Sequence, residues 1–234
     1  MTRHERRFAR THDDFLEDIA AALDIPPSRL DEAKERYESI GAWLDRDGSS
    51  LSGLTPAISP QGSILLGTVI RPLTDREEYD IDLVCQLSVA KSAVTQKQLK
   101  EAVGREVALY AEAHNMSNAP KEGRRCWTLV YAKDAQFHMD ILPGIPDAQS
   151  YQFMLRAHGY GQLAADRPLS GQAIAITDSA HPHYAHYSDD WPQSNPHGYA
   201  AWFRGRMSMQ LSARKRAYAE WERITASVDE IPDH

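Results

Sequence analysis

Two aspartates, Asp80 and Asp82, stand two positions apart inside the apolar run Tyr-Asp-Ile-Asp-Leu-Val-Cys. Side chains alternate between the two faces of a strand, so both carboxylates are expected on one face and Ile81 and Leu83 on the other. Carboxylates held this close repel each other unless a cation lies between them. Mg²⁺ prefers oxygen ligands and completes its shell with water and substrate phosphate, so the pair predicts a Mg²⁺ site, with Mn²⁺ as a substitute.

A glycine-serine turn precedes this strand. Gly62 has no Cβ and Ser63 carries a hydroxyl, so the turn can offer backbone N–H groups and an oxygen to a phosphate at a helix N-terminus. Gln61 is expected to help shape it. Alone, a Gly-Ser pair more often forms an ordinary helix N-cap. Sixteen residues separate Ser63 from Asp80, and this order of turn and Asp-x-Asp strand favours phosphate binding.

A third carboxylate is expected from Asp140, in the segment Phe-His-Met-Asp-Ile-Leu. The following Pro-Gly-Ile-Pro is typical of a turn, which puts Asp140 near the end of a strand at residues 136–142. His138, two residues earlier, shares its face. If this strand lies beside the one that carries Asp80 and Asp82, the three carboxylates can form a two-metal site.

Four segments of the chain together match one group of proteins: Gln61-Gly62-Ser63-x4-Thr68-x-Ile70-Arg71-Pro72, Tyr79-Asp80-Ile81-Asp82-Leu83, Phe137-His138-Met139-Asp140-Ile141 and Ser194-Asn195-Pro196-x-Gly198-Tyr199-x2-Trp202-Phe203. The chain resembles the nucleotidyltransferases of the DNA polymerase β superfamily. Among these it is most similar to the bacterial cGAS/DncV-like nucleotidyltransferases, which make cyclic or linear oligonucleotide second messengers in anti-phage signalling. The first three segments are shared by the whole superfamily, and the fourth is similar to the second-messenger branch.

This resemblance implies an α+β fold of the polymerase β-like nucleotidyltransferase type, with a mixed β-sheet and packed helices. It implies Mg²⁺-dependent joining of nucleoside triphosphates with release of pyrophosphate. The residues to which it gives roles are Asp80, Asp82 and Asp140 for catalysis and metal binding, and Gln61, Gly62, Ser63 and Asn195 for nucleotide binding. Relatives continue into a C-terminal helical lobe, which is expected to be truncated or reduced here.

Two other functions stay open. One is a nucleotidyltransferase of the same superfamily that acts on a protein or small-molecule acceptor. The other is a catalytically silent binding module, which the presence of all three carboxylates disfavours. A regulatory protein partner is compatible with any of these functions.

Composition excludes some partners. The 234 residues carry a formal net charge of −7, so no general attraction to long nucleic acids is expected. The chain has neither a signal-peptide pattern at its N-terminus nor an apolar run of membrane-spanning length, which favours a cytoplasmic protein without membrane contact. Cys85 and Cys126 lie in predicted buried strands and are interpreted as small core residues.

Hydrophobic periodicity predicts helices at residues 13–23, 29–44, 95–114 and 198–224, strands at 79–87 and 173–177, a hairpin of 126–131 and 136–142 with Lys133-Asp134 in its turn, and irregular chain at 49–60 and 181–197. Three regions follow from this order. N-terminal helices (1–60) pack on a catalytic core (61–180), and a loop with the start of a helical lobe (181–234) comes last.

Weaker signals lie near the C-terminus. His181, His183 and His186 form a His-x-His-x2-His cluster that could bind Zn²⁺, but neither a helix nor a strand fixes this spacing, so a polar loop is favoured. The resemblance implies that Asn195 borders the base pocket. Tyr199 could stack on a base, but Tyr199, Trp202 and Phe203 at helical spacing are more often core residues.

Overall fold

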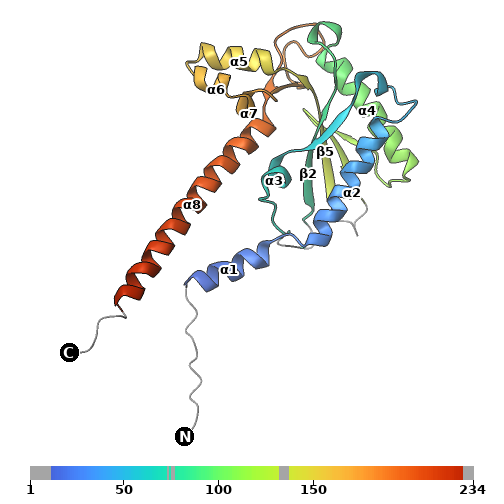
Figure 1. Ribbon diagram of the computed structural model, residues 1–234. Helices are drawn as coiled ribbons and strands as arrows, with labels where there is room; N and C mark the ends of the chain where they lie inside the picture. The colour runs from blue at the N-terminus through green and yellow to red at the C-terminus, as the bar shows by residue number, and fades with distance from the viewer. Residues whose placement is uncertain (1–11, 73, 75–76, 132–136, 229–234) are drawn as a thin grey trace, which may run out of the picture. The chain divides into compact units, whose positions relative to one another are not determined.

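The computed structural model describes residues 12–72, 74, 77–131 and 137–228, and the chain divides into two compact units (Figure 1). The first unit comprises residues 1–145 and 176–191, and the second comprises residues 146–175 and 192–234. These units do not follow the boundaries at residues 60 and 180 expected from the sequence. The N-terminal helix at residues 27–44 belongs with the catalytic strands because it packs on the same sheet.

The sheet of the first unit has the order β1-β2-β5-β4-β3. Its strands are β1 (Ala57–Pro60), β2 (Tyr79–Gln86), β3 (Lys121–Glu122), β4 (Trp127–Val130) and β5 (Phe137–Pro146). The two central strands, β2 and β5, run parallel, whereas the β1–β2, β4–β5 and β3–β4 pairs are antiparallel. The mixed sheet expected from the sequence is therefore confirmed.

The helices of the first unit are α1 (His12–Leu23), α2 (Pro27–Leu44), α3 (Gly62–Leu66) and α4 (Gln96–Ala113), with short 3-10 turns at Ser52–Leu54 and Lys91–Ala93. Thr95 begins α4 with a capping box, because its hydroxyl accepts from the Gln98 amide N–H and the Gln98 side chain accepts from the Thr95 N–H. Pro27 stands in the first turn of α2, where its missing N–H costs nothing. Local chemistry thus sets where both long helices begin.

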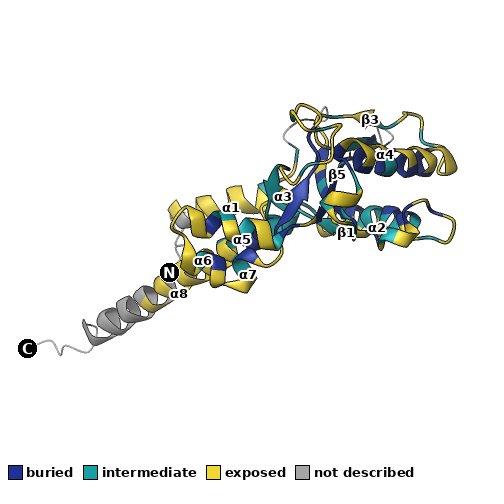
Figure 2. Ribbon diagram, turned by 90° about the horizontal axis from the view of Figure 1, so that it is seen from above, coloured by how far each residue is buried: buried dark blue, intermediate teal, exposed yellow. Residues whose placement is uncertain are grey.

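One face of the sheet is apolar and buried; buried residues are dark blue in Figure 2. Ile81 and Leu83 of β2, and Met139 and Ile141 of β5, have no exposed surface. Helix α2 packs against β1 and α4, and α4 also packs against β4. Burial of each large apolar side chain contributes about 1.5–3 kcal/mol, so this face fixes which residues of each strand point away from it.

The second unit is mostly helical. Its elements are α5 (Ala148–Ala157), α6 (Gly161–Ala165), α7 (Arg167–Ser170), β6 (Ile174–Ile176), β7 (Gln193–Ser194) and α8 (Pro196–Val228). Strands β6 and β7 form a short antiparallel ladder. Helices α7 and α8 are in contact.

The long helices and the strands at residues 79–87, 126–131 and 173–177 agree with the sequence predictions to within a few residues. Two predictions for the sheet of the first unit were wrong, and the segment 181–197, predicted to be irregular, contains β7. The segment 49–60, read as irregular, contains β1, and the Pro143–Pro146 segment, read as a turn, continues β5. In both places a neighbouring strand overrides weak local propensity, since Ser59 pairs with Val84 and Gly144 pairs with Gln86.

Three short helices, α5 to α7, had no counterpart in the sequence predictions. The expected hairpin of β4 and β5 is present, but its turn at Lys133-Asp134 lies outside the described residues. Among the described helices, none is long and apolar enough to cross a lipid bilayer.

Candidate metal centre

Three carboxylates meet on the face of the sheet opposite its apolar core. Asp80 and Asp82 lie on β2 and Asp140 lies on β5, and one side-chain oxygen of each is within 4.8 Å of the others. The strand register pairs Asp82 directly with Asp140, and Asp80 with His138. The structure therefore brings together the three aspartates that the sequence singled out. Asp140 is mid-strand instead of at a strand end, because β5 continues to Pro146.

Asp82 has a raised pKa because it is buried and close to other negative charges. Burial, and then the charges of Asp80 and Asp140, raise the pKa of Asp82 to about 6, while His138 acts in the opposite direction. Near neutral pH the protein therefore holds repelling carboxylates together at a cost in folding free energy. A cation between them would remove that cost.

His138 joins the same cluster. Its Nε2 lies 3.1 Å from Oδ1 of Asp80, and its Nδ1 lies 3.5 Å from Oε2 of Glu78. The hydrogen bond to Asp80 is the main reason that the pKa of His138 is raised. The prediction that His138 shares the face of Asp140 is confirmed.

The glycine-serine turn lies directly against Asp82. Gly62 has a φ of +57°, and a Cβ at this position would stand 2.3 Å from Oδ2 of Asp82. The backbone N–H of Gln61 donates to the Asp82 carbonyl oxygen at 2.8 Å, which ties the turn to β2. Ser63 follows in the first turn of α3. Only glycine combines this backbone conformation with so close an approach to a carboxylate.

Asp140 accepts a hydrogen bond on each of its carboxylate oxygens. The hydroxyl of Thr128 donates to Oδ1, and the thiol of Cys126 donates to Oδ2 at 3.3 Å. Burial, followed by the charge of Asp140, raises the pKa of Cys126 to about 11, so the thiol keeps its proton at neutral pH. The interpretation of Cys126 as a buried strand residue was wrong, because it is half-buried and precedes β4.

Sequence reasoning missed Thr128 entirely. A signal was present, because Cys126 and Thr128 are two apart in a segment predicted to pair with the strand of Asp140. Which of its residues would face Asp140 depends on the register of the β4–β5 pair. Nothing local in the chain specifies that register.

Asn195 lies in the second unit and uses both ends of its side-chain amide there. Its Nδ2 donates to the Leu169 carbonyl oxygen at 2.6 Å, and its Oδ1 accepts from the Gly198 N–H at 3.0 Å. Asn195 therefore caps the start of α8, and its contact with a nucleotide base stays a prediction. Tyr199 and Trp202 are 53% and 44% exposed, so the expectation that they belong to a core was wrong.

The aspartate cluster suits a hard divalent cation. Its ligands are carboxylate oxygens alone, which Mg²⁺ and Mn²⁺ prefer over the nitrogen and sulfur donors typical of Zn²⁺ sites. Among the described residues, no other group of three or more acidic, histidine or cysteine side chains is arranged to hold a metal ion. The histidine cluster is not such a group. Nδ1 of His181 lies 3.2 Å from the side-chain nitrogen of Gln96, as expected for a polar loop.

Residues 56–143 match the domain family described as "Cyclic GMP-AMP synthase DncV-like, nucleotidyltransferase domain". A c-di-GMP synthase of Roseivirga ehrenbergii is 28% identical over 191 residues, which is 82% of this chain and 42% of the relative. The cyclic dinucleotide synthase CdnG of Bradyrhizobium diazoefficiens is 29% identical over 136 residues, or 58% of this chain and 30% of that protein.

The fold is similar to solved structures as well. The structure of Bradyrhizobium diazoefficiens CdnG in complex with GTP superposes with a TM-score of 0.60 at 22% identity, covering 83% of this chain and 46% of that one. At this identity the superposition shows a shared fold. The chain spans less than half the length of these relatives.

We predict that Asp82→Asn stabilises the metal-free protein at neutral pH. A pKa raised from the ordinary 3.8 to about 6 means that the fold favours the protonated carboxyl. Stability present below about pH 4 is therefore lost as the pH rises through about 6, by at most about 3 kcal/mol. Urea unfolding in EDTA should show the gain of Asp82→Asn at about pH 8 and none at about pH 4.

The control for this experiment is Asp31→Asn, which removes an exposed carboxylate from α2. It should leave the free energy of unfolding almost unchanged at both pH values. A wild-type protein as stable as Asp82→Asn at pH 8 would contradict the inferred repulsion.

A second prediction concerns the turn. Gly62→Ala should disrupt the metal centre, because the new Cβ would displace the carboxylate of Asp82. Gly67→Ala is a matched control at the other end of α3, since Gly67 also has a positive φ, +70°, but a Cβ there meets nothing within 4 Å. Both changes should cost about 1–2 kcal/mol of backbone strain. Only Gly62→Ala should weaken Mn²⁺ binding, by about tenfold or more, and equal Mn²⁺ affinities would refute the close-approach argument.

Proposed function

We propose that this chain is a bacterial cGAS/DncV-like nucleotidyltransferase and that it joins nucleoside triphosphates into cyclic or short linear oligonucleotides. Pyrophosphate is the second product. The observation that carries the proposal is the cluster of Asp80, Asp82 and Asp140, with one oxygen of each within 4.8 Å of the others. The relatives are longer than this chain. The proposed activity is therefore that of a whole protein, to which this chain would contribute the metal centre.

The reaction forms a bond between an acceptor hydroxyl oxygen and the α-phosphorus of a donor nucleotide. The bond from that phosphorus to the bridging oxygen breaks, and pyrophosphate leaves with its electrons. Bound Mg²⁺ ions would supply charge neutralisation and ease loss of the acceptor hydroxyl proton to solvent. Asp80 and Asp82 on β2 and Asp140 on β5 are the residues that would hold these ions. The protein otherwise contributes mainly positioning.

The turn at Gln61 to Ser63 is proposed to hold the donor phosphates. Gly62 brings backbone close to Asp82, so a phosphate held by this turn would lie next to the metal-binding carboxylates. The hydroxyl of Ser63 and the adjacent N–H groups are the donors. From the family resemblance, Asn195 is proposed to contact a nucleotide base. To do so, its side-chain amide would have to share its hydrogen bonds to Leu169 and Gly198 with the base, or replace them.

The substrate class follows from the relatives. They include a c-di-GMP synthase and a cyclic dinucleotide synthase, one of them solved with GTP, so purine nucleoside triphosphates are the first substrates to test. We propose a cytoplasmic location, where nucleoside triphosphates are available. An anti-phage signalling role and a regulatory protein partner are proposed from the family alone. With a net charge of −7, no general attraction to a long nucleic acid substrate is expected.

Incubation with each of the four labelled nucleoside triphosphates, followed by thin-layer chromatography, tests the proposal. Label in phosphatase-resistant small oligonucleotides supports it. Label transferred to a protein or a small-molecule acceptor would replace it with the alternative transfer activity. Binding of nucleotide without any product would indicate a silent binding module.

We predict that the double change Asp80→Asn with Asp82→Asn abolishes nucleotide transfer while the protein stays folded. Each change removes a charge but almost no volume, and the two carboxylates share one face of β2. Product formation and thermal unfolding are measured on the same preparation. Wild-type turnover by the double variant would exclude metal-assisted transfer at this site.

Chelation gives an independent prediction. EDTA should stop product formation, and added Mg²⁺ or Mn²⁺ should restore it, since the ligands are carboxylate oxygens. The measurement is product formed against free divalent cation. Activity that survives exhaustive chelation, or that only Zn²⁺ restores, would contradict the assignment to the aspartate cluster.

A further inference from the structure

We propose that Thr128, assisted by Cys126, is a positioning residue that orients Asp140 for metal binding. The inference rests on the metal-dependent reaction proposed above, and it adds two residues that do not themselves bind the metal. Its basis is the pair of donors that the start of β4 directs at the carboxylate of Asp140.

The two donors bind different oxygens of the Asp140 carboxylate. Thr128 donates its hydroxyl proton to Oδ1, and Cys126 donates its thiol proton to Oδ2 at 3.3 Å. An ionised carboxylate has about four acceptor positions, so each oxygen keeps a lone pair for a cation. Donors on both oxygens restrict rotation of the carboxylate about its bond to Cβ. Asp140 is thereby held in one orientation before a metal ion arrives.

Strand pairing makes this arrangement specific. Thr128 is directly opposite Asp140 in the antiparallel β4–β5 pair, so their Cβ atoms lie on the same face at about 5 Å. Cys126 precedes β4 by one residue and is two positions from Thr128, which returns its side chain to that face. A one-residue slip of β4 would place Trp127 or Leu129 opposite Asp140 and remove both donors.

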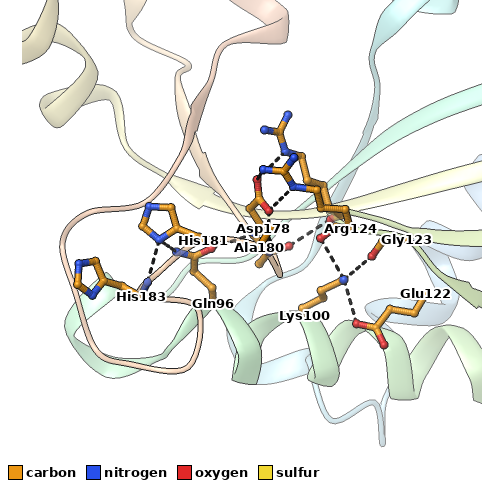
Figure 3. A network of polar contacts seen from close by, with 11 residues as sticks. Gln96, Lys100, Glu122, Gly123, Arg124, Asp178, Ala180, His181 and His183 are labelled. Carbon is orange, nitrogen blue, oxygen red and sulfur yellow. Dashed lines mark hydrogen bonds and ion pairs between the residues drawn. The ribbon is translucent and has the colours of Figure 1, made fainter.

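The β3–β4 hairpin that carries both donors is anchored to α4. Lys100 of α4 is fully buried, and its ammonium group donates to the carbonyl oxygens of Gly123 and Arg124 and to the carboxylate of Glu122 (Figure 3). The indole N–H of Trp127 donates back to the Lys100 carbonyl oxygen at 2.9 Å. A buried cation that binds three groups of one turn leaves that turn little freedom to move.

A second anchor holds the tip of the hairpin. The carboxylate of Asp178, 3% exposed, accepts two hydrogen bonds from Arg124, at 2.6 and 2.8 Å, and one from Arg125 at 3.1 Å (Figure 3). The hydroxyl of Thr177 also donates to the Arg125 carbonyl oxygen. The tip and the start of β4 are thus fixed from both sides, so the donors to Asp140 are held on a rigid element.

Outer groups that orient metal ligands commonly change metal affinity by about 10–100-fold when they are removed. We therefore expect Thr128→Val, which removes the hydroxyl but keeps the shape, to weaken Mn²⁺ binding by about tenfold. Thr128→Ser keeps the hydroxyl and should restore the wild-type affinity. Affinity is measured on the full chain without nucleotide, from the electron paramagnetic resonance signal of free Mn²⁺.

Thr177→Val is the matched control, because it removes a hydroxyl that donates to the same hairpin, at the Arg125 carbonyl oxygen, without touching Asp140. It should lower the unfolding temperature but leave Mn²⁺ affinity unchanged. In transfer assays, Thr128→Val should need more Mg²⁺ for half-maximal rate and recover at saturating Mg²⁺. A merely structural defect would not be rescued by the ion.

Cys126→Ala and Cys126→Ser form a second, independent pair that tests the same proposal if Thr128→Val does not fold. The alanine variant should weaken Mn²⁺ binding by about twofold to threefold, since a thiol is a weak donor, and the serine variant should not. Folded Thr128→Val and Cys126→Ala proteins with wild-type Mn²⁺ affinity overturn the proposal and leave the metal centre standing. If the wild-type chain binds Mn²⁺ no better than the Asp82→Asn variant does, the metal centre itself is contradicted as well.

Discussion

The parallel register of β2 and β5 is the constraint on which the site depends. It places Asp82 beside Asp140, although their charges oppose this arrangement. On the other face of the same strands, Ile81 and Met139 are completely buried. Each such side chain contributes about 1.5–3 kcal/mol, so a few of them outweigh the cost of about 3 kcal/mol at most that burial and charge repulsion together impose on ionised Asp82. A one-residue slip would expose the core and bury the carboxylates.

The elements on the two sides of the β2–β5 pair make different contacts with the carboxylates. On the side of β1 and α3, Gly62 brings bare backbone against Asp82. On the side of β4, Thr128 and Cys126 supply hydrogen bonds to Asp140. One carboxylate is therefore left repelled by its neighbours while another is oriented in advance. Both conditions favour binding of a divalent cation, because the ion relieves the repulsion and finds a ligand already in place.

The division of the chain into two units separates the aspartate cluster from Asn195, the residue proposed to contact a nucleotide base. All three aspartates and the glycine-serine turn belong to the first unit, so the metal centre can be argued from that unit by itself. Asn195 belongs to the second unit, where its side chain caps α8. The relatives are more than twice as long as the part they share with this chain. The metal centre is thus the best supported part of the function, and the identity of the bases is carried by family resemblance.

The sequence by itself determined the features that depend on neighbours along the chain. Alternation put Asp80 and Asp82 on one face, and helical periodicity located α4. Only the tertiary structure decided what depends on register between distant segments. It made a strand of the Ser- and Gly-rich segment that contains β1, and it brought Thr128 to Asp140. The physical reason is that strand pairing joins backbone groups without regard to side-chain type, so its register is selected by packing over the whole sheet.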